Sequence, residues 1–312
     1  MFAKLTDLFH LDLERHMKVF ITGASGYIGT AVVERLKEAG HQPYGLARSD
    51  ASAAKLRALG AVPVPGDLAQ PESLVEPVRT SDAVINLGTT YDAKVDTPAV
   101  ETILRTLEGS GKPFIYTSGI WSHGNTGGKV VDETTPPDPV ELVAWRVDVE
   151  QRVLDSARGG VRSVVIRPAI VYGRGAGIAG EWVESARTRG AARYVGSGEN
   201  RWPAVHVDDL ADLFLLALER APAGTLLLAV NDDEAHPVAE LAAAASRGAG
   251  AGVTQAWPLE EARQKLGAYA DALVLDQRAS GRRAKELLGW SPSRPGILED
   301  LERGSYASAE VA

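Results

Sequence analysis

Cysteine is absent from the 312-residue sequence. The chain therefore forms no disulfide and offers no thiolate nucleophile or cysteine-based metal site, and we predict a cytoplasmic location. Basic clusters are also missing. None is larger than the pair Arg282-Arg283 and the net charge is −8, so the positive surface that nucleic acids require is lacking. No apolar run approaches the length of a membrane span. We predict neither a nucleic-acid nor a membrane partner.

The composition is that of a folded protein with a large core. Hydrophobic residues make up 45% of the chain and charged residues 24%, as in ordinary globular proteins. A length of 312 residues suits one large domain or two unequal ones. We expect residues 1–16 to be an N-terminal extension, either a frayed terminus or a docked surface helix, because Met17 stands directly before the first apolar strand.

One stretch has the pattern of a buried strand, a glycine-rich turn and an amphipathic helix. Residues 19–21 are an apolar run, and apolar residues recur at helical spacing over 28–36. Between them, Gly23, Gly26 and Gly29 permit a tight turn, the approach of a pyrophosphate to the backbone and close helix packing, while the helix N-terminus offers free N–H groups. A purely structural turn is the alternative, but the flanking strand and helix favour a dinucleotide site.

The alternation of strands and helices continues along the chain, which is typical of parallel α/β sheets. We predict further strands over residues 42–47, 61–65, 83–88, 113–119 and 161–171. Helices are expected over 51–59, 71–78, 97–109 and 140–157, with Pro98 in the first turn of the third. Prolines confine the strand at 61–65 to an outer place in the sheet. The polar segment 124–140 is expected to be a loop over the site.

Several motifs together resemble the extended branch of the short-chain dehydrogenase/reductase superfamily, which contains nucleotide-sugar epimerases, dehydratases and reductases. They are Thr22 with the three glycines, Arg167-Pro168 followed by Tyr172-Gly173, the run from His206 to Ala211, and the closing segment 284–292. The resemblance covers about residues 17–304.

The resemblance implies a doubly wound parallel Rossmann sheet of order 3-2-1-4-5-6 with at least one more strand. We expect an NAD(P)-binding domain over residues 17–173 and a smaller C-terminal substrate lobe over residues 174–312. Whether strands and helices of this lobe return to the Rossmann sheet is left open.

Arg48, followed by Ser49, ends the second strand where such folds bind the adenosine ribose. Arginine there suits a 2′-phosphate, so NADP(H) is favoured and NAD(H) remains the alternative, with a solvated Arg48 as the structural explanation. The resemblance implies that Asp67 binds the adenine amino group and that Leu68 packs on the ring; Asp67 also suits a helix cap or turn. The complete predicted cofactor set is Gly23, Ser25, Gly26, Tyr27, Ile28, Arg48, Ser49, Asp67, Leu68, Gly88, Thr89, Thr90, Arg146 and Pro168.

The catalytic pattern of the resembling proteins is missing. They usually carry Tyr-x-x-x-Lys on the helix after the fifth strand, and this motif occurs nowhere in the sequence. When Glu150 is matched to their usual downstream Glu, Leu142 takes the tyrosine column and Arg146 the lysine column, while Gly119 takes the usual hydroxyl column. Arg146 can still bind ribose hydroxyls, but Leu142 cannot transfer a proton. The chain most resembles an atypical group with Thr-Ser-Gly and a Trp-Arg helix.

Substitute catalytic residues are predicted to be Ser118, His123 and Tyr172. His123 titrates near neutral pH, and Ser118 is able to hydrogen-bond a carbonyl. Each has a structural alternative, since Ser118 ends a strand, His123 lies in a loop and Tyr172 can pack. Tyr91 is a further candidate with the same alternative. Trp121 and Trp145 are expected to supply apolar walls or core packing.

Two acidic groups at 208–209 and 232–234 lack a histidine at ligand spacing, so we predict no metal site. Arg201 lies one place away from the position at which sugar-nucleotide members hold a diphosphate, which weakens a nucleotide-sugar substrate.

Two classes of function follow. The first is an NADP(H)-dependent oxidoreductase or epimerase-like enzyme that acts on a small carbonyl or sugar-derived substrate. The second is a non-catalytic NADP(H) sensor. We favour the enzyme, with a small-molecule substrate as its partner, and leave a homodimer open.

Overall fold

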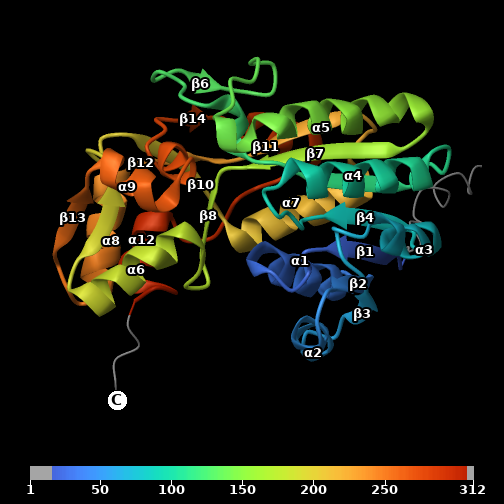
Figure 1. Cartoon of the computed structure of the whole chain (residues 1–312), viewed down its shortest axis with the longest axis horizontal. Coiled ribbons are helices and arrows are strands. Elements are labelled where there is room, and N and C mark those ends of the chain that lie inside the picture. The colour runs from blue at the N-terminus through green and yellow to red at the C-terminus, as the bar shows by residue number, and fades with distance from the viewer. Residues whose placement is uncertain (1–15, 308–312) are drawn as a thin grey trace, which may run out of the picture.

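The computed structural model describes residues 16–307, so the predicted N-terminal extension lies almost wholly outside the described residues. Its centre is a parallel sheet of seven strands with helices on both faces (Figure 1). In sheet order the strands are β11 (Thr225–Ala229), β7 (Arg162–Pro168), β5 (Pro113–Thr117), β4 (Ala83–Asn86), β1 (Lys18–Thr22), β2 (Gln42–Ala47) and β3 (Val62–Pro65). The predicted doubly wound order is confirmed, with β11 as the seventh strand.

β1 is an interior strand because both of its faces are apolar. Val19 and Ile21 belong to one hydrophobic core and Phe20 to a second core, and all three side chains are fully buried. Alternate residues of a strand point to opposite faces, so the two cores lie on the two sides of the sheet. The proline-containing β3 lies at the edge, as predicted.

The helices of the sheet form two layers. α1 and α7 pack against each other, and α4 contacts both α3 and α5. Their bounds are α1 (Tyr27–Glu38), α2 (Asp50–Ala58), α3 (Val75–Thr80), α4 (Ala93–Leu107), α5 (Ala144–Asp155) and α7 (Val207–Arg220). β11 follows residue 173 in the chain yet belongs to this large sheet, and α7 packs against α1 and β5.

The strand predicted over 161–171 is interrupted at Ala169, which corrects the expectation of one continuous strand. Ala169 still donates its N–H to Ala229, at 3.0 Å. Beyond it, β8 (Ile170–Tyr172) leaves the large sheet and joins β10 (Arg201–His206) and β12 (Asn231–Pro237) in a second sheet. Apolar periodicity cannot report this change because every residue from 163 to 170 is buried in one sheet or the other.

α4 also begins earlier than predicted. The side chain of Asp92 caps it by accepting the N–H of Lys94 at 2.9 Å, so the helix starts at Ala93 and Pro98 lies within it. The segment 124–140 contains one short strand, β6 (Val130–Val131), which pairs with β14 (Arg278–Ala279).

The remaining elements form the smaller part seen at the left of Figure 1. They are α6 (Gly177–Arg189), β9 (Ala192–Val195), α8 (Val238–Gly248), β13 (Thr254–Trp257), α9 (Leu259–Leu266), α10 (Tyr269–Leu273) and α12 (Ile297–Arg303). The remaining helix, α11 (Arg282–Leu288), instead contacts β11 and α7 of the larger part.

Gly29 is the glycine whose replacement we expect to damage the fold most directly. A Cβ at this position would lie 2.1 Å from the carbonyl oxygen of Gly23 and 2.8 Å from backbone atoms of Ala24. Alanine normally favours a helix interior, but Gly29→Ala is expected to lower the free energy of unfolding by about 1–3 kcal/mol, because backbone atoms must move.

Gly119→Ala is the matched control, to be compared by urea denaturation. Its Cβ would meet no atom within 4 Å, and its backbone is extended with φ −175°. We expect a change within about 0.5 kcal/mol. Equal stability of the two variants would show that the turn does not depend on this contact.

Candidate functional site

The glycine turn lies against the end of β4, at the point where the chain winding of the sheet reverses. Gly23 has a φ of +71°, and a Cβ there would lie 2.6 Å from the nitrogen of Gly88. Thr22 fixes this approach, since its hydroxyl donates to the side-chain oxygen of Asn86 at 2.7 Å and accepts the N–H of Gly88 at 3.1 Å. The glycine turn therefore meets the carboxyl ends of β1 and β4 at the place where open α/β sheets bind their ligands.

The N-terminus of α1 is a ready anion site. Gly26 is its N-cap and contributes no side-chain hydrogen bond. The first N–H groups of the 12-residue helix are therefore available to phosphate oxygens. Ser25, Tyr27 and Ile28 surround this turn, and the Tyr27 hydroxyl donates to the carbonyl of Gly173 at 2.8 Å.

The residues predicted to hold the adenosine lie at the ends of β2 and β3. Arg48 and Ser49 are exposed. Ser49 also caps α2, because its hydroxyl accepts the N–H of Ser52 at 3.3 Å. One carboxylate oxygen of Asp67 accepts the N–H of Ala69 at 3.0 Å, as expected for a turn, and Leu68 lies beside Gly88. Both the structural and the ligand-binding interpretations of Ser49 and Asp67 are compatible with these positions.

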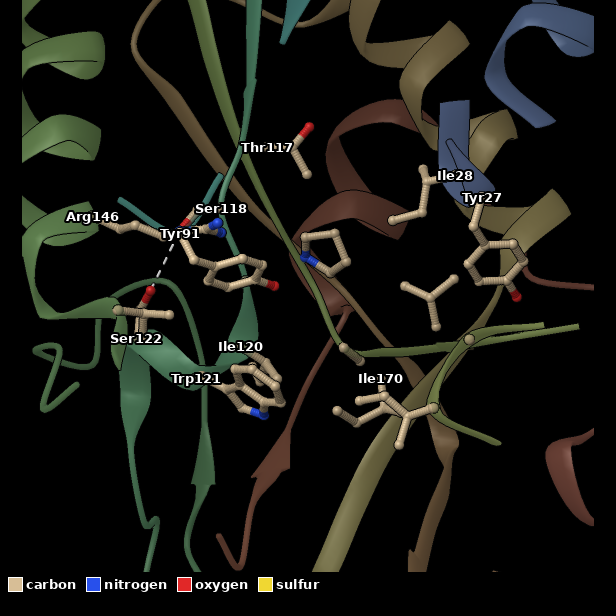
Figure 2. A pocket seen from close by; sticks show the side chains of 17 residues that line it. Tyr27, Ile28, Tyr91, Thr117, Ser118, Ile120, Trp121, Ser122, Arg146 and Ile170 are labelled. Carbon is tan, nitrogen blue, oxygen red and sulfur yellow. Dashed lines mark hydrogen bonds between the residues drawn. The ribbon is translucent and has the colours of Figure 1, made fainter. Parts of the chain in front are cut away.

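A cavity of about 280 Å³ opens at the same end of the sheet (Figure 2). Tyr27 and Ile28 lie on one side of it, and Ser118, Ser122 and Arg146 on the other. The other lining residues are Tyr91, Thr117, Gly119, Ile120, Trp121, Val143, Pro168, Ala169, Ile170, Val171, Gly177 and Ile178. Most of this wall is apolar, so the few polar groups in it decide how a ligand is oriented.

The polar wall continues into a buried network behind the cavity. The Ser118 hydroxyl lies 3.4 Å from that of Ser122, which donates to the carboxylate of Glu150 at 3.1 Å. Arg167 forms a buried ion pair with Glu150, with Nε–Oε2 at 3.0 Å. A carboxylate only accepts hydrogen bonds, so Ser122 uses its hydrogen for Glu150 and its oxygen is free to accept from Ser118. Ser118 then presents oxygen lone pairs to the cavity.

The structure does not bring His123, which we predicted to be a catalytic residue, to the cavity wall. Its Nε2 lies 2.9 Å from Nη1 of Arg167. Since arginine only donates, Nε2 accepts and the hydrogen of the ring is on Nδ1. Burial and the neighbouring Arg167 cation lower the pKa of His123 to about 4. His123 is therefore a neutral supporting residue at physiological pH.

Tyr172 is likewise absent from the cavity wall. Its side chain is fully buried and its hydroxyl donates to the carbonyl of Pro295 at 2.8 Å. Burial raises the pKa of this phenol. It packs edge-on against His206, which caps α7 by accepting the N–H of Asp208 at 3.2 Å. Both residues tie the two parts of the chain together rather than facing a ligand.

Arg146 is a buried cation in the cavity wall. Its side chain donates from Nη2 to the hydroxyl of Thr89 at 2.7 Å, and its guanidinium lies 4.8 Å from the ring centroid of Tyr91. Thr89 and Thr90 in turn donate to the buried carboxylate of Asp96. The predicted segment Gly88-Thr89-Thr90 is thus beside Arg146.

The position of the missing acid is apolar. Leu142 lies in a 3₁₀ turn (Glu141–Val143) and packs on the core, while its neighbour Val143 lines the cavity. Neither side chain carries a proton for transfer. Sequence reasoning did not assign roles to Ser122, Glu150, Arg167 or Asp96. The available signal was the charged residue Arg167 inside an apolar strand, because a buried charge requires a partner.

The described residues fit a nicotinamide dinucleotide. The glycine cradle leaves room where any Cβ would collide with Gly88 or Gly23. Further along the crevice, the Thr117 hydroxyl and Nε of Arg146 are buried without a hydrogen-bond partner among residues 16–307. Unpaired buried polar atoms are unfavourable, and the hydroxyl groups of a bound ribose would satisfy them.

The sequence matches the model of the NAD dependent epimerase/dehydratase family over residues 19–229. An uncharacterized protein of Schizosaccharomyces pombe is 34% identical over 302 residues, which span 93% of this chain and 100% of its own. The 2-alkyl-3-oxoalkanoate reductase of Stenotrophomonas maltophilia is 27% identical over 245 residues, 72% of this chain and 73% of its own. UDP-glucose 4-epimerase of Thermus thermophilus, solved with NAD, shares the fold with a TM-score of 0.76 at 21% identity, over 93% of this chain and 98% of its own.

The chain belongs to the NAD dependent epimerase/dehydratase family, whose members bind NAD(P). Within residues 16–307, every helix is too short or too polar to cross a membrane. The same residues contain no group of three histidine, aspartate or glutamate side chains able to hold a metal ion.

The lowered pKa of His123 in the folded protein makes the stability depend on pH. The pKa is 6.5 in the unfolded chain and about 4 in the folded one, so between these values the unfolded state binds the extra proton. Stability is therefore lost as the pH falls. We expect His123 to account for about 2–3 kcal/mol of the loss between pH 7.5 and 4.5, and His123→Gln to remove this share in urea denaturation.

His236→Gln is the control of opposite sign. A hydrogen bond to Glu234 raises the pKa of His236, so its contribution is present at acidic pH and is lost as the pH rises. His236→Gln should therefore make the free energy of unfolding fall more steeply as the pH decreases. An unchanged pH dependence in His123→Gln would show that the histidine is not held neutral.

Proposed function

We propose that the protein is an NADP(H)-dependent oxidoreductase that acts on a small, largely apolar carbonyl compound. The observation that carries this proposal is the cavity of about 280 Å³ beside the glycine turn, with apolar walls and a single polar side. This volume must hold the reactive end of a cofactor together with a substrate, so it favours a small one. A relative named as an oxoalkanoate reductase supports the same reaction class.

A nucleotide-sugar substrate is disfavoured by the position of Arg201. This residue lies on β10 outside the cavity wall, and its guanidinium donates to the carbonyl of Ala235 at 3.1 Å. Among the cavity-lining residues the only cation is Arg146, which lies on the predicted cofactor side. No lining cation remains for a diphosphate.

Each polar residue of the site has a distinct role in this proposal. When bound, the nicotinamide ring would supply or accept the hydride. Arg146 and Thr117 would orient the adjoining ribose by hydrogen bonds. Ser118 would accept a hydrogen bond from a hydroxyl group, because Ser122 and Glu150 draw its own hydrogen away from the cavity. The apolar residues Ile28, Ile170 and Trp121 would exclude water from the reacting carbon.

A non-catalytic NADP(H) sensor is the second candidate. It is favoured by Val143, which occupies the cavity wall near the expected acid and cannot exchange a proton. It would bind the dinucleotide through the same crevice but turn over no substrate.

The preference for NADP(H) is proposed to depend on Arg48, because a charge-assisted contact with a phosphate contributes about 1.5–3 kcal/mol. Arg48→Ala should therefore weaken NADP⁺ binding about 10- to 150-fold in calorimetric titration and leave NAD⁺ binding nearly unchanged. Arg57→Ala is the control, since Arg57 is also exposed but lies at the other end of α2. Equal losses for both nucleotides would remove Arg48 from phosphate recognition.

The enzyme and the sensor differ in turnover. We expect NADPH oxidation, followed by its absorbance, with one or more members of a panel of small aliphatic and aromatic ketones and aldehydes, and none with a 4-keto sugar nucleotide. Tight NADPH binding without consumption across the panel would favour the sensor. Consumption only with the sugar nucleotide would refute the small apolar substrate.

A further inference from the structure

Tyr91 has a backbone conformation that bulky residues avoid. Its φ is +59°, and only Tyr91 and Arg174 among the non-glycine residues from 16 to 307 have a positive φ. Such a conformation persists only where the surroundings fix it, and it is concentrated at functional sites. Arg174 lies outside the cavity wall and forms ion pairs with Glu34 and Asp208. Tyr91 lines the cavity, so its strained backbone lies at the candidate site.

A network centred on Asp96 holds the strained loop. This carboxylate is only 5% exposed and accepts hydrogen bonds from the hydroxyls of Thr89 and Thr90 and from the N–H of Thr90, at 2.6–2.9 Å. The Thr89 hydroxyl accepts the N–H of Tyr91 at 3.2 Å, and the Thr90 hydroxyl accepts that of Asp92 at 3.2 Å. The loop between β4 and α4 is therefore rigidly built around Tyr91.

The ring of Tyr91 stacks on Arg146 and its hydroxyl points into the open centre of the cavity (Figure 2). The side chain is half exposed, at 50%, so the hydroxyl also reaches solvent. Within residues 16–307, this hydroxyl makes no hydrogen bond, whereas the Tyr27 and Tyr172 hydroxyls are bound to backbone carbonyls. Tyr91 is thus the phenol of the cavity whose hydrogen is available to a ligand.

We propose that Tyr91 is the catalytic acid that takes the place of the missing family tyrosine. This inference rests on the proposed oxidoreductase function. In the reductive direction, the carbonyl carbon would receive a hydride from a bound reduced nicotinamide dinucleotide. The π electron pair moves to the carbonyl oxygen, which takes the hydroxyl proton of Tyr91. The resulting phenolate lies beside the Arg146 cation and regains a proton from water at its exposed face.

The other polar groups of the wall are less suited to this step. Ser118 directs its hydrogen toward Ser122, and His123 faces Arg167 outside the cavity. Arg146 donates its hydrogen bond to Thr89 and stacks on the Tyr91 ring. Tyr91 therefore approaches the carbonyl from the loop after β4 and not from the segment 141–155, which carries Val143 and Arg146 at the cavity.

The test compares Tyr91→Phe with Tyr269→Phe. The first variant keeps the ring over Arg146 and removes only the hydroxyl. The second removes a phenol hydroxyl from a residue that packs edge-on against Trp121 but does not line the cavity. Tyr91→Asn is a second variant that removes the whole phenol. Asparagine tolerates a positive φ, so the loop is expected to keep its conformation.

Both Tyr91 variants should bind NADPH as tightly as the native protein, within about twofold by fluorescence titration. Their kcat for the carbonyl substrate should fall at least about 100-fold with little change in KM. The pH profile of kcat should also change in Tyr91→Phe. Tyr269→Phe should keep the native kcat and pH profile.

A native kcat and pH profile in Tyr91→Phe would overturn the role of Tyr91 and leave the oxidoreductase function standing. Loss of NADPH binding in both Tyr91 variants would also overturn it, since the residue would then act on cofactor binding. If the native protein binds NADPH but reduces no carbonyl, both proposals fail together.

Discussion

The buried ion pair between Glu150 and Arg167 is the interaction on which the candidate site depends. Both residues are at most 4% exposed, so neither charge is solvated by water. Removing one partner of such a pair costs about 3–5 kcal/mol, because the other charge is left buried and unpaired. The pair joins α5 to β7, and through Ser122 and His123 it also fixes the 3₁₀ turn Ile120–His123. One interaction thus positions three of the segments that surround the cavity.

The opposite side of the site is built without charge. There the backbone of the glycine turn approaches the end of β4 so closely that a Cβ on Gly23 would clash with the backbone of Gly88. Thr22 and Asn86 complete this contact by a hydrogen bond. The resulting cavity has one polar wall and several apolar ones, which restricts a bound ligand to one orientation of its polar groups.

The sequence was informative wherever local chemistry determines structure. The apolar run of β1, the three glycines and the prolines of β3 each predicted an element and its place in the sheet. The sequence was not informative where a residue distant in the chain decides the direction of a side chain. The carbonyl of Pro295 binds the Tyr172 hydroxyl, and Arg167 occupies Nε2 of His123, so neither side chain faces the cavity.

Two further features of the backbone have no signature in the sequence. The break at Ala169 depends on the pairing of β8 with β10, which apolar periodicity does not indicate. The strained conformation of Tyr91 depends on the hydrogen bonds that Asp96 accepts from the preceding threonines. The assigned ligand-binding roles of the cofactor residues stay predictions.

The central claim is that the cavity beside Ser118, Arg146 and Tyr91 receives the reactive end of a nicotinamide dinucleotide. A crystal structure of the protein with NADP⁺ tests it most directly. The account predicts the pyrophosphate at the N-terminus of α1, a ribose hydroxyl bonded to Arg146 or Thr117, and the nicotinamide ring inside the cavity. A dinucleotide bound with its nicotinamide outside this cavity, or with its pyrophosphate away from the glycine turn, would contradict the account.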